Sequence, residues 1–363
     1  MPGNNVPDIG NNMMDGSCVS VVHGGDVYRN EVVLDFSVNL NPVPMPREVM
    51  DAASAGLLEM SQYPDPLQQK LRECIASYEG VPAENITCGN GASELMMAVC
   101  HAFRPRKALI TAPCYAGYER ALRASEAKVT EYQLAEAADF ALGEDFLQQL
   151  TDDIDIVFIA DPNNPDGKLI DPALKHRITE TCEKNGIILV IDECFLPLTE
   201  RGLERRAPED RALHLRAFTK TFAIPGIRIG YMISEDTDKL DAISQHLPEW
   251  NVSRIAERTG EAAAKVLAET DYLASSVRLI DEERSFLKGE LGSLGIKVYE
   301  SNTNYLLFRC RPDLYERLLK KGILIRRCAN FSGLDDTYFR IAVRKHEDNL
   351  QLVSALKEII GAK

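Results

Sequence analysis

Lys220 and Arg228 lie eight residues apart in a stretch of small and apolar residues, and their side chains could do chemistry together. An amine in apolar surroundings is poorly solvated when charged, so its pKa falls and it can attack an aldehyde carbon. From residue 226 to 231 bulky residues alternate with glycines and Arg228, which predicts a strand with one bare face carrying a cation. An anionic group could approach that face closely, although such a pair taken alone is more often solvated surface.

Asp192 follows a fully apolar run, residues 187–191, which predicts a strand that carries the carboxylate into the interior. Burial of a carboxylate without a cationic partner is very costly. The partner of Asp192 is therefore expected to be either a structural cation of the protein or a bound ligand.

Three further segments could contact a ligand. Residues 89–94 run from glycines into a helical pattern, and the backbone N–H groups of Ala92 and Ser93 could bind a phosphate, unless this is an ordinary capped helix. Tyr115 lies in a turn after a predicted strand and could stack on a flat ligand, or pack under its own loop. Asn164 lies in a Pro-rich turn that ends another strand and offers a hydrogen-bond donor.

These side chains need elements that bring them together. Strand and helix patterns alternate from about residue 86 to 233, which predicts a mainly parallel, doubly wound α/β sheet with ligands at the carboxyl ends of its strands. The predicted strands are 108–111, 128–132, 154–160, 187–191, 214–218 and 228–233.

The rest of the chain divides around this sheet. A long helical section covers about 235–292, and an α+β unit follows with predicted strands at 297–299, 304–308, 323–326 and 338–343 and a helix at 346–360. We expect an N-terminal arm (1–45) that packs with the small domain, a large domain (46–250) and a small C-terminal domain (251–363).

Composition excludes several classes of function. The net charge of −14 argues against a nucleic-acid surface, so an anionic ligand needs local cations and backbone amides. No apolar run reaches the length of a membrane span, and the first residues resemble no export signal. Nine scattered cysteines suit a reducing compartment. We expect a soluble cytoplasmic protein without a bound metal.

The order of these motifs resembles the fold-type-I enzymes that use pyridoxal 5'-phosphate, the aspartate aminotransferase superfamily. Asn164, Asp192 and Lys220 follow one another at intervals of 28 residues, each near a strand end. The resemblance implies that Lys220 forms the Schiff base with the cofactor, that Asp192 pairs with the pyridine nitrogen and that Asn164 donates to the ring hydroxyl. It also assigns the ring stacking and the phosphate contacts to Tyr115, Ala92, Ser93, Thr219 and Arg228.

Two families of this superfamily are especially similar to the chain, histidinol-phosphate aminotransferase and L-threonine O-3-phosphate decarboxylase. The stretches that favour the decarboxylase are 23–25, 34–42, 222–226, 323–326 with 328–330, and 338–344. The resemblance to this family implies that the phosphorylated substrate contacts His23, Gly24, Asn39, Asn164, Arg326 and Arg340. From the pattern alone, Arg340 could be solvated, because it alternates with apolar residues on a strand, and His23 could be a plain loop residue.

One position bears on the type of reaction. The aminotransferases usually have a tyrosine three residues after the ring-binding aspartate, whereas this chain has Phe195, as the decarboxylase does. Decarboxylation of an O-phosphorylated amino acid is therefore the first candidate function. Transamination of a phosphorylated amine such as histidinol phosphate is the second. A non-catalytic cofactor-binding regulator is a remote third, because the short acidic N-terminus cannot form a basic DNA-binding domain.

Three residues depart from the pattern of both families. Asp166 replaces the expected Thr, Ala217 replaces a hydroxyl residue, and Arg327 adds a charge, which leaves the natural substrate open.

Tyr63 matches the tyrosine that reaches the phosphate of the partner's cofactor. We therefore expect a homodimer with sites built from two chains.

Overall fold

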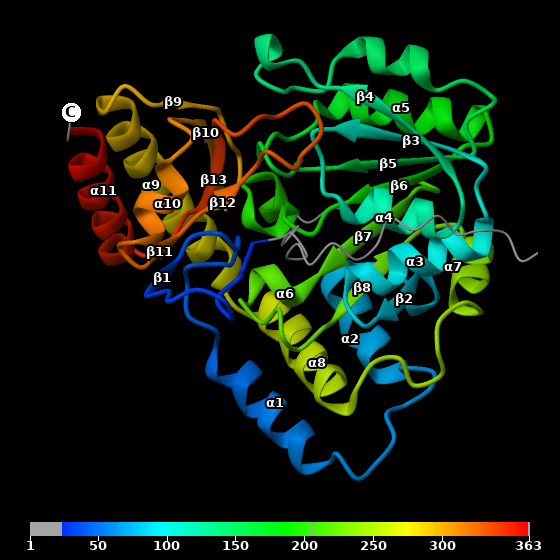
Figure 1. The fold of residues 1–363 in the computed structure, drawn as a ribbon. Helices are drawn as coiled ribbons and strands as arrows, with labels where there is room; N and C mark the ends of the chain where they lie inside the picture. The colour runs from blue at the N-terminus through cyan, green and yellow to red at the C-terminus, as the bar shows by residue number, and fades with distance from the viewer. Residues whose placement is uncertain (1–23, 205–206, 209, 362–363) are drawn as a thin grey trace, which may run out of the picture.

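A seven-stranded sheet forms the centre of the protein in this computed structural model, which describes residues 24–204, 207–208 and 210–361 (Figure 1). Its strands are β2 (Ile86–Gly89), β3 (Lys107–Ala112), β4 (Lys128–Gln133), β5 (Ile156–Ala160), β6 (Ile188–Asp192), β7 (Leu213–Ala217) and β8 (Gly230–Ile233). They lie in the order β2-β8-β7-β6-β5-β3-β4, and β8 is antiparallel to both of its neighbours while the other adjacent pairs are parallel. The predicted mainly parallel α/β fold is confirmed.

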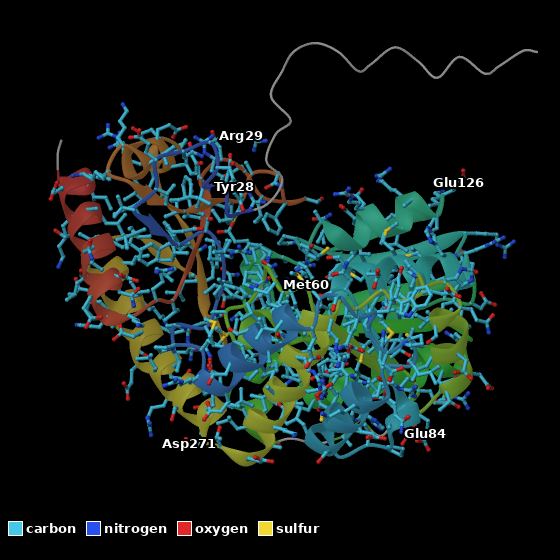
Figure 2. The ribbon with its side chains drawn as sticks, turned by 90° about the horizontal axis from the view of Figure 1, so that it is seen from below. Tyr28, Arg29, Met60, Glu84, Glu126 and Asp271 are labelled. Carbon is cyan, nitrogen blue, oxygen red and sulfur yellow. The ribbon has the colours of Figure 1, made fainter. Side chains whose placement is uncertain are left out.

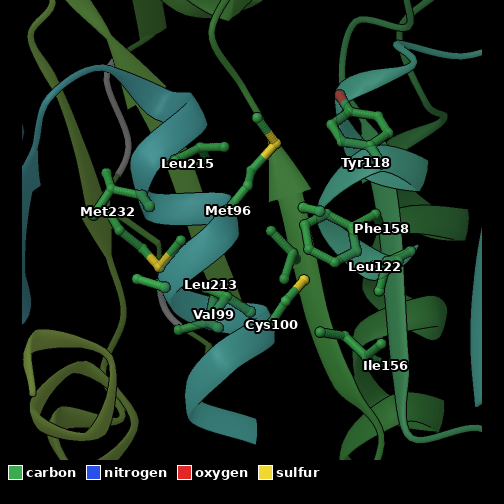
Figure 3. Packing of buried hydrophobic residues seen from close by; sticks show 14 of the residues in the cluster. Met96, Val99, Cys100, Tyr118, Leu122, Ile156, Phe158, Leu213, Leu215 and Met232 are labelled. Atoms are coloured by element: carbon green, nitrogen blue, oxygen red, sulfur yellow. The ribbon is translucent and has the colours of Figure 1, made fainter. Parts of the chain in front are cut away.

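Helices cover both faces of this sheet, which explains why its central strands are almost continuously apolar. One face packs against α3 (Ala92–Phe103), α4 (Gly117–Ala124) and α7 (Thr237–Ser244). Figure 3 shows Met96, Val99 and Cys100 of α3 directed at side chains of β5 and β7. The other face packs against α2 (Gln69–Glu79), α5 (Pro172–Lys184) and α8 (Arg254–Glu269). The strand ends are thereby held rigidly.

A second, antiparallel sheet lies beside the first and belongs to the C-terminal part of the chain (Figure 1). Its strands are β9 (Lys297–Val298), β10 (Tyr305–Arg309), β12 (Arg326–Arg327) and β13 (Tyr338–Ala342), in the order β12-β13-β10-β9. A buried apolar cluster joins it to α9 (Tyr272–Ser293), α10 (Leu314–Leu319) and α11 (His346–Gly361). The predicted domain boundaries themselves stay a prediction.

The N-terminal arm is tied to this C-terminal part. Strand β1 (Leu34–Asp35) pairs in parallel with β11 (Ile323–Leu324), and Figure 1 shows the two side by side. Phe36, fully buried, joins the same apolar cluster as α9 and α11. Residues 37–39 are therefore fixed in space directly after the strand.

Several predicted elements have different limits in the structure. The helical section 235–292 divides into α7, α8 and α9, and the predicted strand 323–326 divides between β11 and β12, which belong to different sheets. The remaining elements are α1 (Arg47–Leu58), α6 (Phe218–Thr221), and short 3-10 helices at Ala83–Asn85, Glu136–Ala138, Glu144–Gln149, Leu196–Leu198 and Arg201–Glu204. Among the described residues, no helix is both long and apolar enough to span a bilayer.

Candidate functional site

A cavity of about 260 Å³ opens at the carboxyl ends of β5, β6 and β7 and contains most of the predicted site residues. This is the position at which doubly wound sheets hold ligands. The predicted residues that line the cavity are Gly24, Asn39, Ala92, Ser93, Tyr115, Asn164, Asp192, Thr219, Lys220, Arg228, Arg326 and Arg340.

The charges in the cavity wall favour an anionic ligand. Four cationic side chains line it, namely Lys220, Arg228, Arg326 and Arg340, whereas Asp192 is the only acidic residue among the described lining residues. The whole chain carries a net charge of −14, so the positive charge of the cavity wall is opposite in sign to that of the chain.

Lys220 projects from α6, a single helical turn that begins directly after β7. Burial, and to a smaller extent the nearby Arg340 and Arg228 guanidinium groups, lower the pKa of the Lys220 amine, although Cys194 and Asp192 oppose this. The Nζ atom lies 5.8 Å from the ring centroid of Phe195. The amine is thus closer to the neutral, nucleophilic form than an exposed lysine is.

Asp192 ends β6 and is held by two neutral donors. The Tyr118 hydroxyl donates to Oδ2 at 2.7 Å, and the backbone N–H of Cys194 donates to Oδ1 at 2.9 Å. Among the described residues no cation forms a salt bridge with Asp192. The predicted structural ion pair belongs instead to the next residue, Glu193, which pairs with Lys175 and Arg216. The cation that Asp192 requires is therefore left to a ligand.

The start of α3 offers backbone donors to the cavity. Gly91 precedes the helix with φ of 77°, and no side chain caps its first turn. A Cβ atom on Gly91 would lie 2.5 Å from Arg228 Nη2, so the glycine lets the guanidinium approach the helix. Free N–H groups at a helix start together with an arginine form a suitable phosphate site.

The predicted strand geometry around Arg228 is wrong. Strand β8 begins at Gly230, and Arg228 lies in the preceding turn with φ of 62°, donating from Nη1 to Pro225 O at 3.0 Å. The turn overrides the alternating pattern because the backbone must reverse between α6 and β8. Arg228 still lines the cavity, but from a loop.

Tyr115 lies at the cavity edge in the segment between β3 and α4, and its placement depends on Gly117. A Cβ atom on Gly117 would lie 2.2 Å from Tyr115 Cε1, so only glycine leaves room for this ring position. The Tyr115 ring meets Tyr118 edge-on, with centroids 5.5 Å apart. Burial raises the pKa of the Tyr115 hydroxyl, so the ring remains neutral.

Asn164 and Arg340 meet in the cavity although they are 176 residues apart. Arg340 Nη1 donates to Asn164 Oδ1, and Nη2 donates to Ser37 O at 3.0 Å. Because the oxygen of the Asn164 amide accepts from Arg340, its NH₂ group remains available as a donor. Arg340 is 6% exposed, so the alternative of a solvated arginine is wrong.

Arg326 lies on the same side of the cavity as Arg340. Its Nη1 donates to Arg327 O at 2.6 Å, its Nη2 donates to Asn330 Oδ1 at 2.7 Å, and it lies over the Phe331 ring. Burial and, more weakly, Arg340 lower its pKa to about 10. A bound anionic ligand would stabilise the charged form of Arg326.

Two buried polar atoms in the cavity wall lack hydrogen-bond partners among the described residues. They are Asn39 Oδ1 and Arg340 Nε, an acceptor and a donor. Gly24 packs against Ser37, whose carbonyl oxygen accepts from Arg340, and a Cβ atom at position 24 would lie 2.2 Å from Ser37 O. Unpaired buried polar atoms are costly, so a ligand that both donates and accepts fits here.

The residues that bear on the reaction type or depart from the two families differ in their distance from the cavity. Phe195 and Ala217 line it, and Phe195 packs edge-on against Tyr305 with centroids 5.1 Å apart. Arg327 is exposed, pairs with Glu316 and lies over the Tyr315 ring. Arg327 is therefore not part of the cavity wall.

Of the two remaining predicted residues, one lies outside the described part of the chain and the other lies outside the cavity wall. His23 falls outside the described residues. Tyr63 is 79% exposed and packs at a tilt against Trp250 with ring centroids 4.8 Å apart. Within this single chain Tyr63 contributes nothing to the cavity wall.

Sequence reasoning missed several cavity residues, among them Tyr118, Ser37, Asn330 and Phe331. Tyr118 carried a usable signal, since it is a second aromatic residue three positions after Tyr115 and follows the same predicted strand. The others act through contacts between distant segments, which no local pattern reveals.

Pyridoxal 5'-phosphate, which the resemblance implies, fits the residues present. Its aldehyde requires an amine such as Lys220, its pyridine nitrogen requires a carboxylate such as Asp192, and its phosphate requires donors such as those at the start of α3. Asp192 without a described cation and α3 without a side-chain cap are the observations that this cofactor would explain.

Comparisons with known proteins show the family of the chain. The family model described as aminotransferase class I and II matches residues 31–356. The threonine-phosphate decarboxylase of Salmonella typhimurium is 34% identical over 353 residues, covering 93% of this chain and 96% of the relative. The histidinol-phosphate aminotransferase of Thermococcus gammatolerans is 32% identical, covering 90% of this chain and 91% of the relative.

Solved structures give the same picture. The histidinol-phosphate aminotransferase from Clostridium acetobutylicum superposes with a TM-score of 0.83 at 31% identity, over 91% of this chain and all of that one. The L-threonine-O-3-phosphate decarboxylase from Porphyromonas gingivalis, at 24% identity, has a TM-score of 0.77 over 91% of this chain and 100% of that chain, and it supports the fold alone.

Proposed function

The chain belongs to the aminotransferase class I and II family, whose enzymes use pyridoxal phosphate, and from this premise we propose that it decarboxylates an O-phosphorylated amino acid. The observation that carries the proposal is the pair Arg326 and Arg340, which face one cavity together with Asn39 and Lys220. Two arginines suit a substrate with two acidic groups, a carboxylate and a phosphate.

The cofactor would be held by residues at successive strand ends. Asp192 would bind the ring nitrogen, Tyr115 would lie against the ring, and Asn164 would donate to the ring oxygen through the amide group that Arg340 leaves available. The N–H groups of Ala92 and Ser93, the Thr219 hydroxyl and Arg228 would bind its phosphate. When bound, the cofactor supplies an electron sink for the electrons released at the α-carbon of the substrate.

The remaining residues would bind the substrate and move a proton. Arg340 would bind the carboxylate, while Arg326 and Asn39 would bind the phosphate, with Gly24 and His23 beside it. Once CO₂ has left, Lys220 would return a proton to the α-carbon, and its lowered pKa suits that exchange near neutral pH. Phe195 offers no hydroxyl near the ring oxygen, which agrees with decarboxylation.

Transamination of a phosphorylated amine such as histidinol phosphate is the second candidate. It is favoured by the likeness to the Clostridium acetobutylicum enzyme, with a TM-score of 0.83 at 31% identity. In that case Lys220 would remove the proton from the α-carbon, and Arg340 would bind the carboxylate of 2-oxoglutarate.

One experiment separates the two candidates. Purified protein is incubated with O-phospho-L-threonine or O-phospho-L-serine, and released CO₂ and amine are measured. A parallel reaction contains histidinol phosphate with 2-oxoglutarate, and glutamate is measured. We expect CO₂ from a phosphoamino acid and much less from unphosphorylated threonine. Rapid glutamate formation without CO₂ release from either phosphoamino acid would contradict the proposal.

We also propose a cytoplasmic homodimer. Support comes from large apolar side chains exposed near Tyr63, namely Leu58 at 86%, Met60 at 74% and Leu67 at 70%; Met60 is labelled in Figure 2. Such a surface is costly in a monomer, and a two-fold contact would bury it and carry Tyr63 towards the partner's cavity. Light scattering should give twice the chain mass, and a fully active monomer would contradict this role of Tyr63.

A further inference from the structure

Asp166 is a buried carboxylate in the turn between β5 and α5, outside the cavity wall. Its side chain is 0% exposed. Both of its oxygens accept hydrogen bonds, because Lys168 N donates to Oδ1 at 2.9 Å and Asn163 Nδ2 donates to Oδ2. The residue therefore stabilises the turn that carries Asn164.

Asn163, which donates to Asp166, links this turn to two other segments. Asn163 Nδ2 also donates to Pro113 O at 3.1 Å, and Pro113 begins the loop that carries Tyr115. The Tyr305 hydroxyl of β10 donates to Asn163 O at 2.7 Å. The side-chain amide of Asn163 thus joins the turn that carries Asn164 to the loop that carries Tyr115.

We propose that Asp166 is a positioning residue that holds the Asn164 turn against the Tyr115 loop and thereby sets the affinity for the cofactor. The inference rests on the proposed cofactor site, but it requires neither decarboxylation nor transamination. Asp166 stands where the resemblance leads us to expect a threonine, which cannot ionise.

The charge of Asp166 controls this junction. The two accepted hydrogen bonds require the carboxylate form, whereas burial favours the neutral acid and raises the pKa of Asp166 to about 7. The other titratable groups that act on Asp166 or respond to it are Lys168, which is bonded to Asp139, and the Tyr305 hydroxyl and the Cys114 thiol.

Protonation of Asp166 would weaken the junction. A proton on Oδ2 would face the Asn163 NH₂ group, so that hydrogen bond is lost. The amide cannot simply turn over, because its oxygen would then face Pro113 O, another acceptor. Asn163 would then lose its hydrogen bond either to Asp166 or to Pro113 O in the Tyr115 loop.

The test measures binding of pyridoxal phosphate to the apoprotein at pH values from 6 to 8.5, by fluorescence or equilibrium dialysis. The wild type is compared with Asp166→Asn and with Asp152→Asn, an exposed control that removes the same charge. At pH 8 we expect Asp166→Asn to bind about tenfold more weakly than wild type, as the loss of one buried hydrogen bond predicts. At pH 6 the two proteins should differ little, because the wild-type carboxyl is then neutral.

Two results would overturn the inference. One is equal affinity of Asp166→Asn and wild type at pH 8, and the other is an Asp152→Asn protein as weak as Asp166→Asn. If Asp166→Asn does not fold, Asp166→Thr replaces it, because a Thr hydroxyl can still accept from Lys168 N, and its affinity should lack the step near pH 7. A protein that binds the cofactor as expected but releases no CO₂ would refute only the proposed reaction.

Thermal unfolding of the apoprotein gives an independent measurement. The pKa of Asp166 is about 4 in the unfolded chain and about 7 in the folded one, so the folded state binds more protons between these values. The stability of the wild type relative to Asp166→Asn should therefore fall as pH rises from 4 to 7. A constant difference between their unfolding temperatures over this range would contradict the assigned environment of the carboxyl.

Discussion

Replacement of Arg326 by Ala should remove the preference for phosphorylated substrates. Arg326 is 6% exposed and is fixed by Arg327 O and Asn330, so it can meet an anion with little loss of side-chain entropy. With a pKa of about 10, it is still charged at pH 8. A hydrogen bond to a charged group contributes roughly 1.5–3 kcal/mol. At 1.4 kcal/mol for each factor of ten, kcat/KM for O-phosphothreonine should fall about 10- to 150-fold.

The assay compares kcat/KM for O-phosphothreonine and threonine in the wild type, Arg326→Ala and Arg327→Ala. Arg327 is the matched control, since it is the adjacent arginine but is exposed and paired with Glu316. Threonine should be affected little by either change, because it lacks the phosphate. An equal loss for both substrates would show that Arg326 maintains the fold of the cavity and does not bind the phosphate, and the reasoning would then be refuted.

Three other changes test the rest of the site. Lys220→Ala should abolish turnover and the yellow colour of the holoenzyme, and borohydride should label Lys220 in wild type; a label on another lysine contradicts the assignment. Gly91→Ala should lower cofactor affinity more than Gly80→Ala, as measured by dialysis, because both glycines have positive φ but only the Cβ of the first meets Arg228. Lys175→Met should lower the free energy of unfolding by roughly 3 kcal/mol in urea, since it leaves buried Asp161 and Glu193 short of a cation.

The sequence predicted the cavity better than it predicted the detail around it. Asn164, Asp192 and Lys220 meet because the carboxyl ends of adjacent parallel strands lie at one sheet edge, a rule that needs only strand order. The alternating pattern near Arg228 placed the start of the strand at residue 228, whereas β8 begins at Gly230, because the same spacing also fits a turn between glycines. Periodicity is ambiguous over such short stretches.

Other features depend on tertiary contacts and had no local signal. The hydrogen bond from Tyr118 to Asp192 joins residues 74 positions apart, and Arg340 reaches Asn164 across 176. The alternation around residue 340 allowed either a solvated or a functional arginine, and only the position of β13 beside the large sheet decides between them. No sequence pattern indicated the ionic partners of Glu193, because these residues come from α5 and β7.

The pairing of β1 with β11 has a consequence for the order of events during synthesis. Leu34 lies opposite Ile323, so the strand that places residues 37–39 in the cavity lacks its partner until nearly the whole chain has left the ribosome. Contacts so distant in sequence form late, because a long loop must close first. The large sheet could condense earlier from its neighbouring strands and helices. A nascent chain that ends before residue 323 should therefore contain Lys220 in folded surroundings and yet lack the wall that selects the substrate.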